Sequence, residues 1–214
     1  MKRLAALILI FVLAVPLFYS CAGEKEEAEP PRENLVLSET EAREVLVDLI
    51  EGAYEINVIF FGDGLPYEGE PSTDSTSDAY YLPVSDEAGY KSITEIKLAS
   101  EKIYSEGYLE SVYRTAFEGI TITDSDAEEG YAGYPLSPRY KMFDSELRVN
   151  AKHQGFDLNT VPLAETAVVV ECTPDYVTVQ LNYTRKNDAE FSGTMRLQLT
   201  QNEEGEWRLD SPTY

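Results

Sequence analysis

The spacing of apolar residues changes once along this chain, at Gly119, and that change constrains the fold more than any other feature. Before Gly119, apolar residues recur every three or four positions, the period of an α-helix. After it they alternate with polar residues, as in an antiparallel sheet with one face in water. This order predicts an α+β fold, in which N-terminal helices pack on one face of a twisted antiparallel sheet of about five to six strands.

Helix start signals divide the first part of the chain into three expected helices. The clearest helix covers residues 38–61, where Ser38 and Glu41 form a capping box at its start. A second capping box begins a helix at Ser92, and Ser105 is the expected N-cap of a third. The polar stretch between the first two helices is expected to be an exposed loop that leads into a short strand.

The strands are expected mostly in the second half of the chain. Asp144 and Ser145 form a two-residue hairpin signal between two of them. Pro83 cannot donate a ladder hydrogen bond, so it places the early short strand at a sheet edge. The expected strand ranges are 79–84, 138–143, 146–151, 164–172, 175–185, 189–200 and 207–210.

Residues 1–20 have the organisation of a secretory signal peptide. Two basic residues precede an apolar run from Leu4 to Val15, which is too short to span a bilayer of roughly 30 Å. Ser20 before Cys21 matches the cleavage site of lipoprotein signal peptidases, so Cys21 is the expected lipid-carrying residue. Ordinary cleavage after Ala22 is the alternative. Both cleavages predict a mature chain outside the cytoplasm.

The rest of the chain is expected to be a tether followed by one domain. Residues 21–36 are predicted to be a flexible acidic tether, because the stretch up to Asn34 is charged and lacks large apolar residues. Residues 37–214 are predicted to form a single α+β domain, held at the outer face of the bacterial cytoplasmic membrane by the acylated Cys21 in the lipid bilayer. Loss of the signal peptide would change the formal net charge from −22 to about −24, which argues against nucleic acid as a partner.

Residues that commonly carry catalysis or bind transition metals are scarce. His153 is the one histidine and is expected in an exposed loop. Cys172 alternates with Val168 and Val170, which favours a buried core thiol over a nucleophile. This composition argues against a zinc site, and the P-loop, G-x-G-x-x-G and G-x-S-x-G motifs are absent. We therefore expect a non-enzymatic protein with no cofactor.

An acidic, tyrosine-bearing segment is the candidate partner-binding surface. Exposed tyrosine beside glycine suits a binding surface, although the 15 tyrosines of this chain also suit core packing. The alternating acids resemble the first half of a calcium loop, but Pro135 stands where the bidentate glutamate is expected. A solvated acidic loop and weak calcium binding at 124–130 are both open. The candidate residues are Asp124, Asp126, Glu128, Tyr131 and Tyr134.

Six segments of the sequence carry a resemblance to a known family. They are Tyr80–Val84, Tyr90–Lys97, Ile103–Leu109, Arg139–Tyr140, Leu147–Asn150 and Trp207–Thr213. Together they resemble clostridial lipoproteins grouped with the IseA-type inhibitors of cell-wall DL-endopeptidases, over about residues 38–214. This resemblance implies an extracytoplasmic α+β fold and a protein that occludes the active-site cleft of a secreted cell-wall cysteine endopeptidase. The helix-then-sheet order also resembles nuclear-transport-factor-like and cystatin-like domains.

Two functions from different classes follow. The first is a membrane-anchored, extracytoplasmic binding protein that inhibits a peptidoglycan DL-endopeptidase. The alternative is a small-ligand pocket protein or weak enzyme of the nuclear-transport-factor-like type; a structural lipoprotein without a dedicated ligand is a third possibility. An apolar filled core beneath the sheet would favour the first, and a polar pocket with convergent acids there would favour the second.

Overall fold

In the described part of the chain, all but one of the strands follow the three α-helices, and the strands pair in antiparallel sheets, which confirms the α+β class. The computed structural model describes residues 33–71, 77–121 and 135–214, all within the compact unit Glu33–Tyr214. The predicted signal peptide and most of the predicted tether lie outside the described residues. Within those residues no helix has the length and apolar character needed to cross a membrane.

Helix α1 (Glu39–Phe60) is the longest helix of the described chain and begins where the capping box predicts. The Ser38 hydroxyl accepts a hydrogen bond from the Glu41 amide, and the Glu41 carboxylate accepts one from the Ser38 amide at 3.0 Å. Its buried residues recur at three- and four-residue steps and form the inner face of the helix. They are Ala42, Leu46, Leu49, Ala53, Ile56, Asn57, Ile59 and Phe60.

Helices α2 (Ile93–Ser100) and α3 (Glu106–Tyr113) also begin at the predicted caps. Ser92 and Ser105 each accept a hydrogen bond from the amide three residues ahead, at 3.2 and 3.1 Å. After α3 the chain makes one π-helical turn, η3 (Arg114–Glu118). Gly119 then ends the helical region with a φ of +82°, a conformation that glycine adopts without strain.

The strands divide into two sheets and a short ribbon, not the single sheet expected. One sheet has the order β1-β5-β4, from β1 (Tyr81–Pro83), β4 (Tyr140–Phe143) and β5 (Glu146–Asn150). The other has the order β6-β7-β8-β9, from β6 (Thr160–Cys172), β7 (Val177–Arg185), β8 (Asp188–Gln201) and β9 (Trp207–Leu209). The ribbon pairs β2 (Ile120–Thr121) with β3 (Pro135–Leu136). All these pairings are antiparallel, and β1 is an edge strand, as Pro83 predicts.

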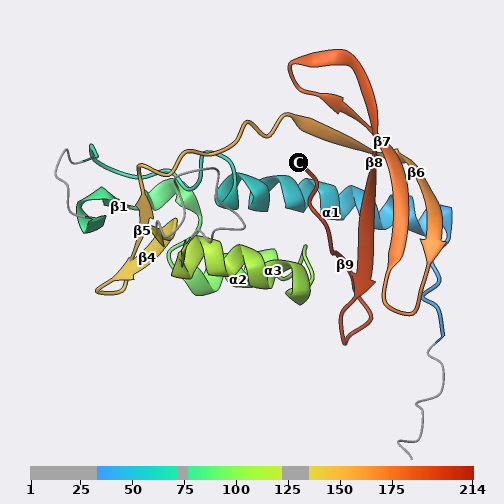
Figure 1. The fold of residues 1–214 in the computed structure, drawn as a ribbon, viewed down its shortest axis with the longest axis horizontal. Helices are drawn as coiled ribbons and strands as arrows, with labels where there is room; N and C mark the ends of the chain where they lie inside the picture. The colour runs from blue at the N-terminus through green and yellow to red at the C-terminus, as the bar shows by residue number, and fades with distance from the viewer. Residues whose placement is uncertain (1–32, 72–76, 122–134) are drawn as a thin grey trace, which may run out of the picture. The chain divides into compact units, whose positions relative to one another are not determined.

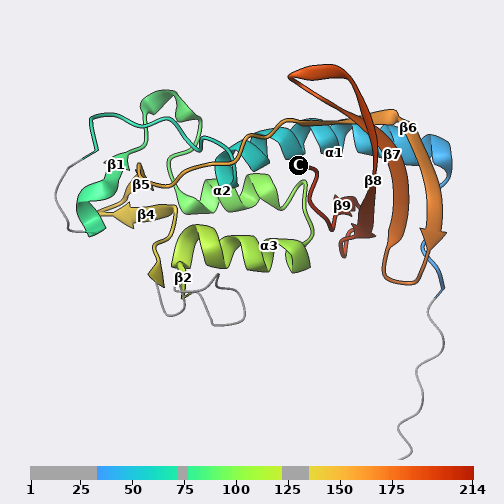
Figure 2. The ribbon, with the colours of Figure 1, turned by 45° about the horizontal axis from the view of Figure 1, so that its top comes forward.

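The chain between β5 and β6 separates the two sheets. Residues 151–159 form no ladder and cross the C-terminal end of α1, where the Phe156 amide donates to the Phe61 carbonyl at 2.6 Å. Figure 1 shows the four-stranded sheet beside the first part of α1 and the three-stranded sheet near the C-terminal end of α1. Helices α2 and α3 run close together beside α1 in both views (Figure 2).

The sheet face toward α1 is filled with apolar side chains that alternate with polar ones along each strand. The Arg43 guanidinium on α1 ties this layer to β6 by donating to the Ala167 carbonyl at 3.0 Å. Two register shifts in β6 break its alternation, so that Val169 and Cys172 pack toward the core while Val170 is 46% exposed. Cys172 consequently packs against the core, but it is half-buried where a buried thiol was expected. The buried sheet residues are Ala164, Ala167, Val177, Val179, Leu181, Leu197, Leu199 and Leu209.

Candidate functional site

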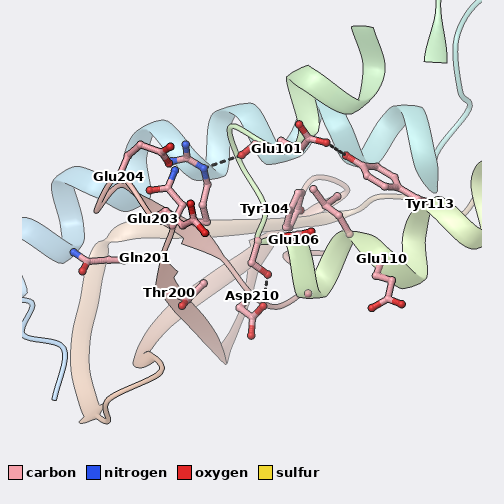
Figure 3. Close-up of a pocket in the computed structure, with 15 residues that line it drawn as sticks. Glu101, Tyr104, Glu106, Glu110, Tyr113, Thr200, Gln201, Glu203, Glu204 and Asp210 are labelled. Atoms are coloured by element: carbon pink, nitrogen blue, oxygen red, sulfur yellow. Dashed lines mark hydrogen bonds between the residues drawn. The ribbon is translucent and has the colours of Figure 1, made fainter. Parts of the chain in front are cut away.

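A groove open to solvent, with a volume of about 870 Å³, lies between the start of α3 and the turn that joins β8 to β9. Its lining includes two tyrosines, Tyr104 and Tyr113, and one cationic residue, Arg208. Figure 3 shows side chains from the two elements on opposite sides of the groove. We call it the acidic groove, because its lining includes six carboxylates, Glu101, Glu106, Glu110, Glu203, Glu204 and Asp210.

Backbone pairing between β9 and the α2–α3 connection holds the two sides of the groove together. The connection runs parallel to β9, with a bridge between Tyr104 and Leu209. The Leu209 amide donates to the Ile103 carbonyl, and the Ser105 amide donates to the Leu209 carbonyl, both at 2.8 Å. Leu209 is fully buried and Tyr104 is 1% exposed, so this pairing lies in the core.

Ser105 links the start of α3 to the end of β9. Its hydroxyl oxygen accepts the Tyr108 amide as the N-cap of α3, and its hydroxyl proton is donated to the Asp210 carboxylate (Figure 3). Two acids, Glu106 and Asp210, therefore lie at the first turn of α3, where the helix amides carry partial positive charge.

Arg208 fixes the opposite side of the groove. Its Nη2 atom lies 2.5 Å from the Glu206 carboxylate, and its Nε atom donates to the Glu101 carbonyl at 2.8 Å. Glu206 also accepts a hydrogen bond from Asn202 at 3.1 Å, which closes the β8–β9 turn. Because Arg208 and Asn202 donate to it, the pKa of Glu206 lies below its usual value. The guanidinium is thus already engaged within the fold.

The tyrosines of the groove keep their hydroxyl protons at physiological pH. Burial raises the pKa of Tyr104 to about 12, and its hydroxyl donates to the buried side chain of Asn57 at 2.8 Å. Burial also raises the pKa of Tyr113 to about 12, with a further contribution from the nearby Glu101 carboxylate. The groove therefore combines the neutral aromatic surface of Tyr113 with several carboxylates.

This arrangement suits the recognition of cationic groups. Carboxylates at the rim can accept charge-assisted hydrogen bonds from lysine or arginine side chains, and tyrosine surface can contact their aliphatic stems. The described residues contain no group of three or more His, Cys, Asp or Glu side chains that could hold a metal ion.

None of the residues selected from the sequence is among the described residues that line the groove. Cys21 and the candidate loop (Asp124, Asp126, Glu128, Tyr131 and Tyr134) are outside the described residues, as is the calcium-like stretch 124–130. The described ends of that loop are paired in the β2–β3 ribbon, where Ile120 faces Leu136. This ribbon follows η3, whereas the acidic groove is lined by residues of α3 from Glu106 to Tyr113.

His153 is not the exposed loop residue that the sequence led us to expect. It is half-buried in the turn after β5, where its amide donates to the Asn150 carbonyl at 3.0 Å. Burial lowers the pKa of His153, and the positive charge of Arg139 lowers it further.

The groove acids were not distinguishable among the 39 acidic residues of the sequence. They come from the α2–α3 connection, α3, the β8–β9 turn and the residue after β9, which the parallel bridge between Tyr104 and Leu209 brings together. The sequence held one local signal for these acids. Asn202–Gly205 predicts a turn, and Glu203 and Glu204 lie within it. No protein-family profile and no curated protein sequence matches the chain.

Proposed function

We propose that this chain is a membrane-anchored extracytoplasmic lipoprotein whose folded domain binds a basic surface of a secreted cell-wall hydrolase and restrains that enzyme without catalysis of its own. The observation that supports this most is the acidic groove, where six carboxylates meet one arginine that is already paired. A lysine or arginine of a partner would gain several acceptors there. The resemblance to IseA-type inhibitors adds the class of partner, a cysteine DL-endopeptidase.

The filled core beneath the four-stranded sheet supports a protein partner over a small ligand held by the sheet. Apolar side chains of α1, β7 and β8 occupy that space, and several of them, such as Leu46, Val179 and Leu197, have no exposed surface. The acids of the groove lie instead outside this core, where β9 and the β8–β9 turn meet α3 and the α2–α3 connection. A broad charged groove on an edge is suited to a macromolecular surface.

An inhibition assay tests the function. The domain from residue 21 onward, with Cys21→Ser to prevent acylation, is mixed with a DL-endopeptidase secreted by the same cell, and the release of peptidoglycan fragments is followed. We expect slower digestion with the domain left intact. The inhibition should weaken as salt rises, since charges further apart than roughly 8 Å are screened at 0.15 M.

Two double variants separate the groove from general acidity. Glu106→Gln with Glu110→Gln neutralises two exposed groove carboxylates on α3. Glu44→Gln with Asp48→Asn removes the same charge from exposed positions of α1 that do not line the groove. We expect the first pair to weaken inhibition about 10-fold and the second by less than about 3-fold.

The loop selected from the sequence is tested in the same assay. If it supplies the main contact, replacing Tyr131 and Tyr134 with alanine weakens inhibition more than the groove variants do, since buried aromatic residues usually dominate interface energies. The proposal is abandoned if no cell-wall peptidase of the host is bound or slowed at micromolar concentrations of the domain.

Detergent phase separation tests the anchor independently of the partner. The wild-type chain should partition into the detergent phase, and Cys21→Ser should move it to the aqueous phase or leave it unprocessed, because the acyl chains would be missing. A mature wild-type protein that begins at Gly23 and stays in the aqueous phase would show that the chain is exported without lipidation.

A further inference from the structure

A second pocket, of about 350 Å³, lies between α1, the start of β6 and the segment 213–214. The marked C-terminal end of the chain lies beside α1 in both ribbon views (Figures 1 and 2). Two half-exposed aromatic residues line the pocket, Tyr54 at 48% and Tyr214 at 42%. Its apolar walls are Ile50, Leu158, Val161 and Pro162.

A fixed polar group stands among these apolar walls. Asn57 and Thr213 both line the pocket and are 2% and 5% exposed. The Asn57 amide donates to the Thr213 hydroxyl at 2.8 Å, while its carbonyl accepts the Tyr104 hydroxyl at 2.8 Å. Two hydrogen bonds therefore hold the Asn57 side chain in one orientation, so this part of the pocket is formed before any ligand arrives.

The fold also positions a cation at this pocket. The tip of the β7–β8 hairpin is fastened to Asn159, whose carbonyl accepts the Lys186 amide at 2.9 Å and whose side chain accepts the Asn187 amide at 3.2 Å. The Lys186 ammonium thereby lies over the Tyr54 ring, 3.7 Å from its centroid. Among the described residues no carboxylate lies within ion-pair distance of Lys186, although Glu51 also lines the pocket.

We propose that this pocket binds a small soluble organic anion, with its apolar or aromatic body between α1 and β6 and its negative group at the Lys186 ammonium. Apolar walls with a few fixed polar groups are the usual make-up of small-molecule sites, and the volume lies within their usual range. Lys186 supplies the charge complementarity. No carboxylate of the described residues pairs with its ammonium, so a ligand carboxylate or sulfonate could form this ion pair. The pocket is separate from the acidic groove, so this inference does not depend on the proposed inhibition.

Two dyes that differ by one sulfonate test the proposal. The anion 8-anilinonaphthalene-1-sulfonate and the neutral N-phenyl-1-naphthylamine are titrated by fluorescence into the domain from residue 21 onward with Cys21→Ser, whose folded part is one compact unit. We expect one site that binds the anion more tightly than the neutral dye, by about 10-fold.

Charge variants at the mouth should act in opposite directions. Lys186→Gln should weaken binding of the anionic dye about 5- to 10-fold and leave the neutral dye unchanged, whereas Glu51→Gln should tighten the anion about 2-fold. Lys152→Gln is the matched control. It removes the same charge from a lysine that also lies over a tyrosine ring, Tyr80, but does not line the pocket.

Substitutions that fill the pocket with a larger side chain test whether the dye binds there. Val161→Trp should abolish binding of both dyes, and Leu158→Trp is a second filling variant in case the first does not fold, with circular dichroism reporting the fold of each. The proposal is overturned if the filling variants bind normally, if Lys186→Gln and Lys152→Gln have the same effect, or if no dye binds. Tighter binding of the neutral dye would also overturn it, since the pocket would then select apolar surface without charge.

Discussion

The backbone of Gly155 lies directly against that of Gly62, at the point where the chain crosses the end of α1. A Cβ atom at position 155 would overlap the carbonyl oxygen of Gly62. The neighbouring Phe156 amide donates to the Phe61 carbonyl at 2.6 Å, so the two segments cannot separate without losing that bond. This close approach lets residues 151–159 pass over the end of α1 on their way from the three-stranded sheet to the four-stranded sheet.

Gly155→Ala should therefore destabilise the domain. We expect a loss of about 2–4 kcal/mol in the free energy of unfolding, because one backbone must move away from the other. Chemical denaturation followed by circular dichroism measures it. Gly107→Ala in α3 is the control: a Cβ there meets only Asp210, at 3.9 Å, so it should be neutral or slightly stabilising. Equal stability of the two variants would show that the crossing segment is free to shift.

Arg139 closes the C-terminal end of α1 from inside the protein. It is 1% exposed, and its guanidinium donates to the carbonyl oxygens of Phe60 at 3.1 Å and Gly62 at 2.6 Å. The Phe60 carbonyl is one that the helix end leaves unpaired and that carries partial negative charge, and the Gly62 carbonyl lies two residues beyond the helix. Gly64 leaves room for the guanidinium because it has no Cβ atom; a Cβ there would lie 2.5 Å from Nη2. Its φ of +84° is also one that glycine adopts without strain.

Arg139→Met should cost about 2–4 kcal/mol in the free energy of unfolding, since it leaves buried carbonyls without donors. Arg148→Met provides the comparison, because Arg148 is partly exposed and pairs with an exposed Glu146, so its loss should cost less than about 1 kcal/mol. Urea denaturation midpoints of both variants test this. A similar small loss for both would mean that other groups can replace the Arg139 contacts.

The β4–β5 turn contains two residues with positive φ that are not glycine. Asp144 has a φ of +46° and Ser145 a φ of +73°, the backbone of a two-residue hairpin turn. Ser145→Gly should raise the free energy of unfolding by about 0.5–1 kcal/mol, because glycine adopts this conformation without strain. Ser111→Gly, within α3, should lower it by a similar amount. A rise in the thermal midpoint for the first and a fall for the second are the expected outcomes.

Local signals in the sequence predicted most of the elements. The caps at Ser38, Ser92 and Ser105 and the turn at Asp144 depend on residues within four positions of one another, so one sequence suffices to recognise them. The α+β class followed from the change of period at Gly119. The edge position of β1 followed from Pro83, which has no amide proton to donate.

Distant pairings were not predictable in this way. The segment between the two sheets crosses α1 where Gly155 approaches Gly62, and these two residues are far apart in sequence and carry no side chain that would indicate a partner. The acidic groove depends on the bridge between Tyr104 and Leu209, a parallel pairing that alternation of apolar residues cannot reveal. The bulges in β6 likewise moved Cys172 away from the alternation that the sequence implied.

His153 should make the stability of the domain depend on pH near neutrality. Its pKa in the folded domain lies below the ordinary value of 6.5, because the ring is half-buried and close to the positive charge of Arg139. The unfolded chain therefore binds this proton more readily than the folded domain does. The stability contributed by the neutral ring is fully present above pH 6.5 and is lost progressively as pH falls below it.

Thermal unfolding of the wild type and of His153→Gln at several pH values between about 5 and 8 isolates this contribution. Glutamine cannot take up the proton, so the variant should lose less stability than the wild type as the pH falls from 7 to 5. Carboxylates also titrate toward the lower end of this range, but they are common to both proteins and cancel in the difference. A difference in midpoint that stays constant across the range would show that the ring takes up its proton equally easily in the folded and unfolded chains. A wild type that loses less stability than His153→Gln as the pH falls from 7 to 5 would mean that the folded domain stabilises the protonated ring, the opposite of what its burial beside Arg139 requires.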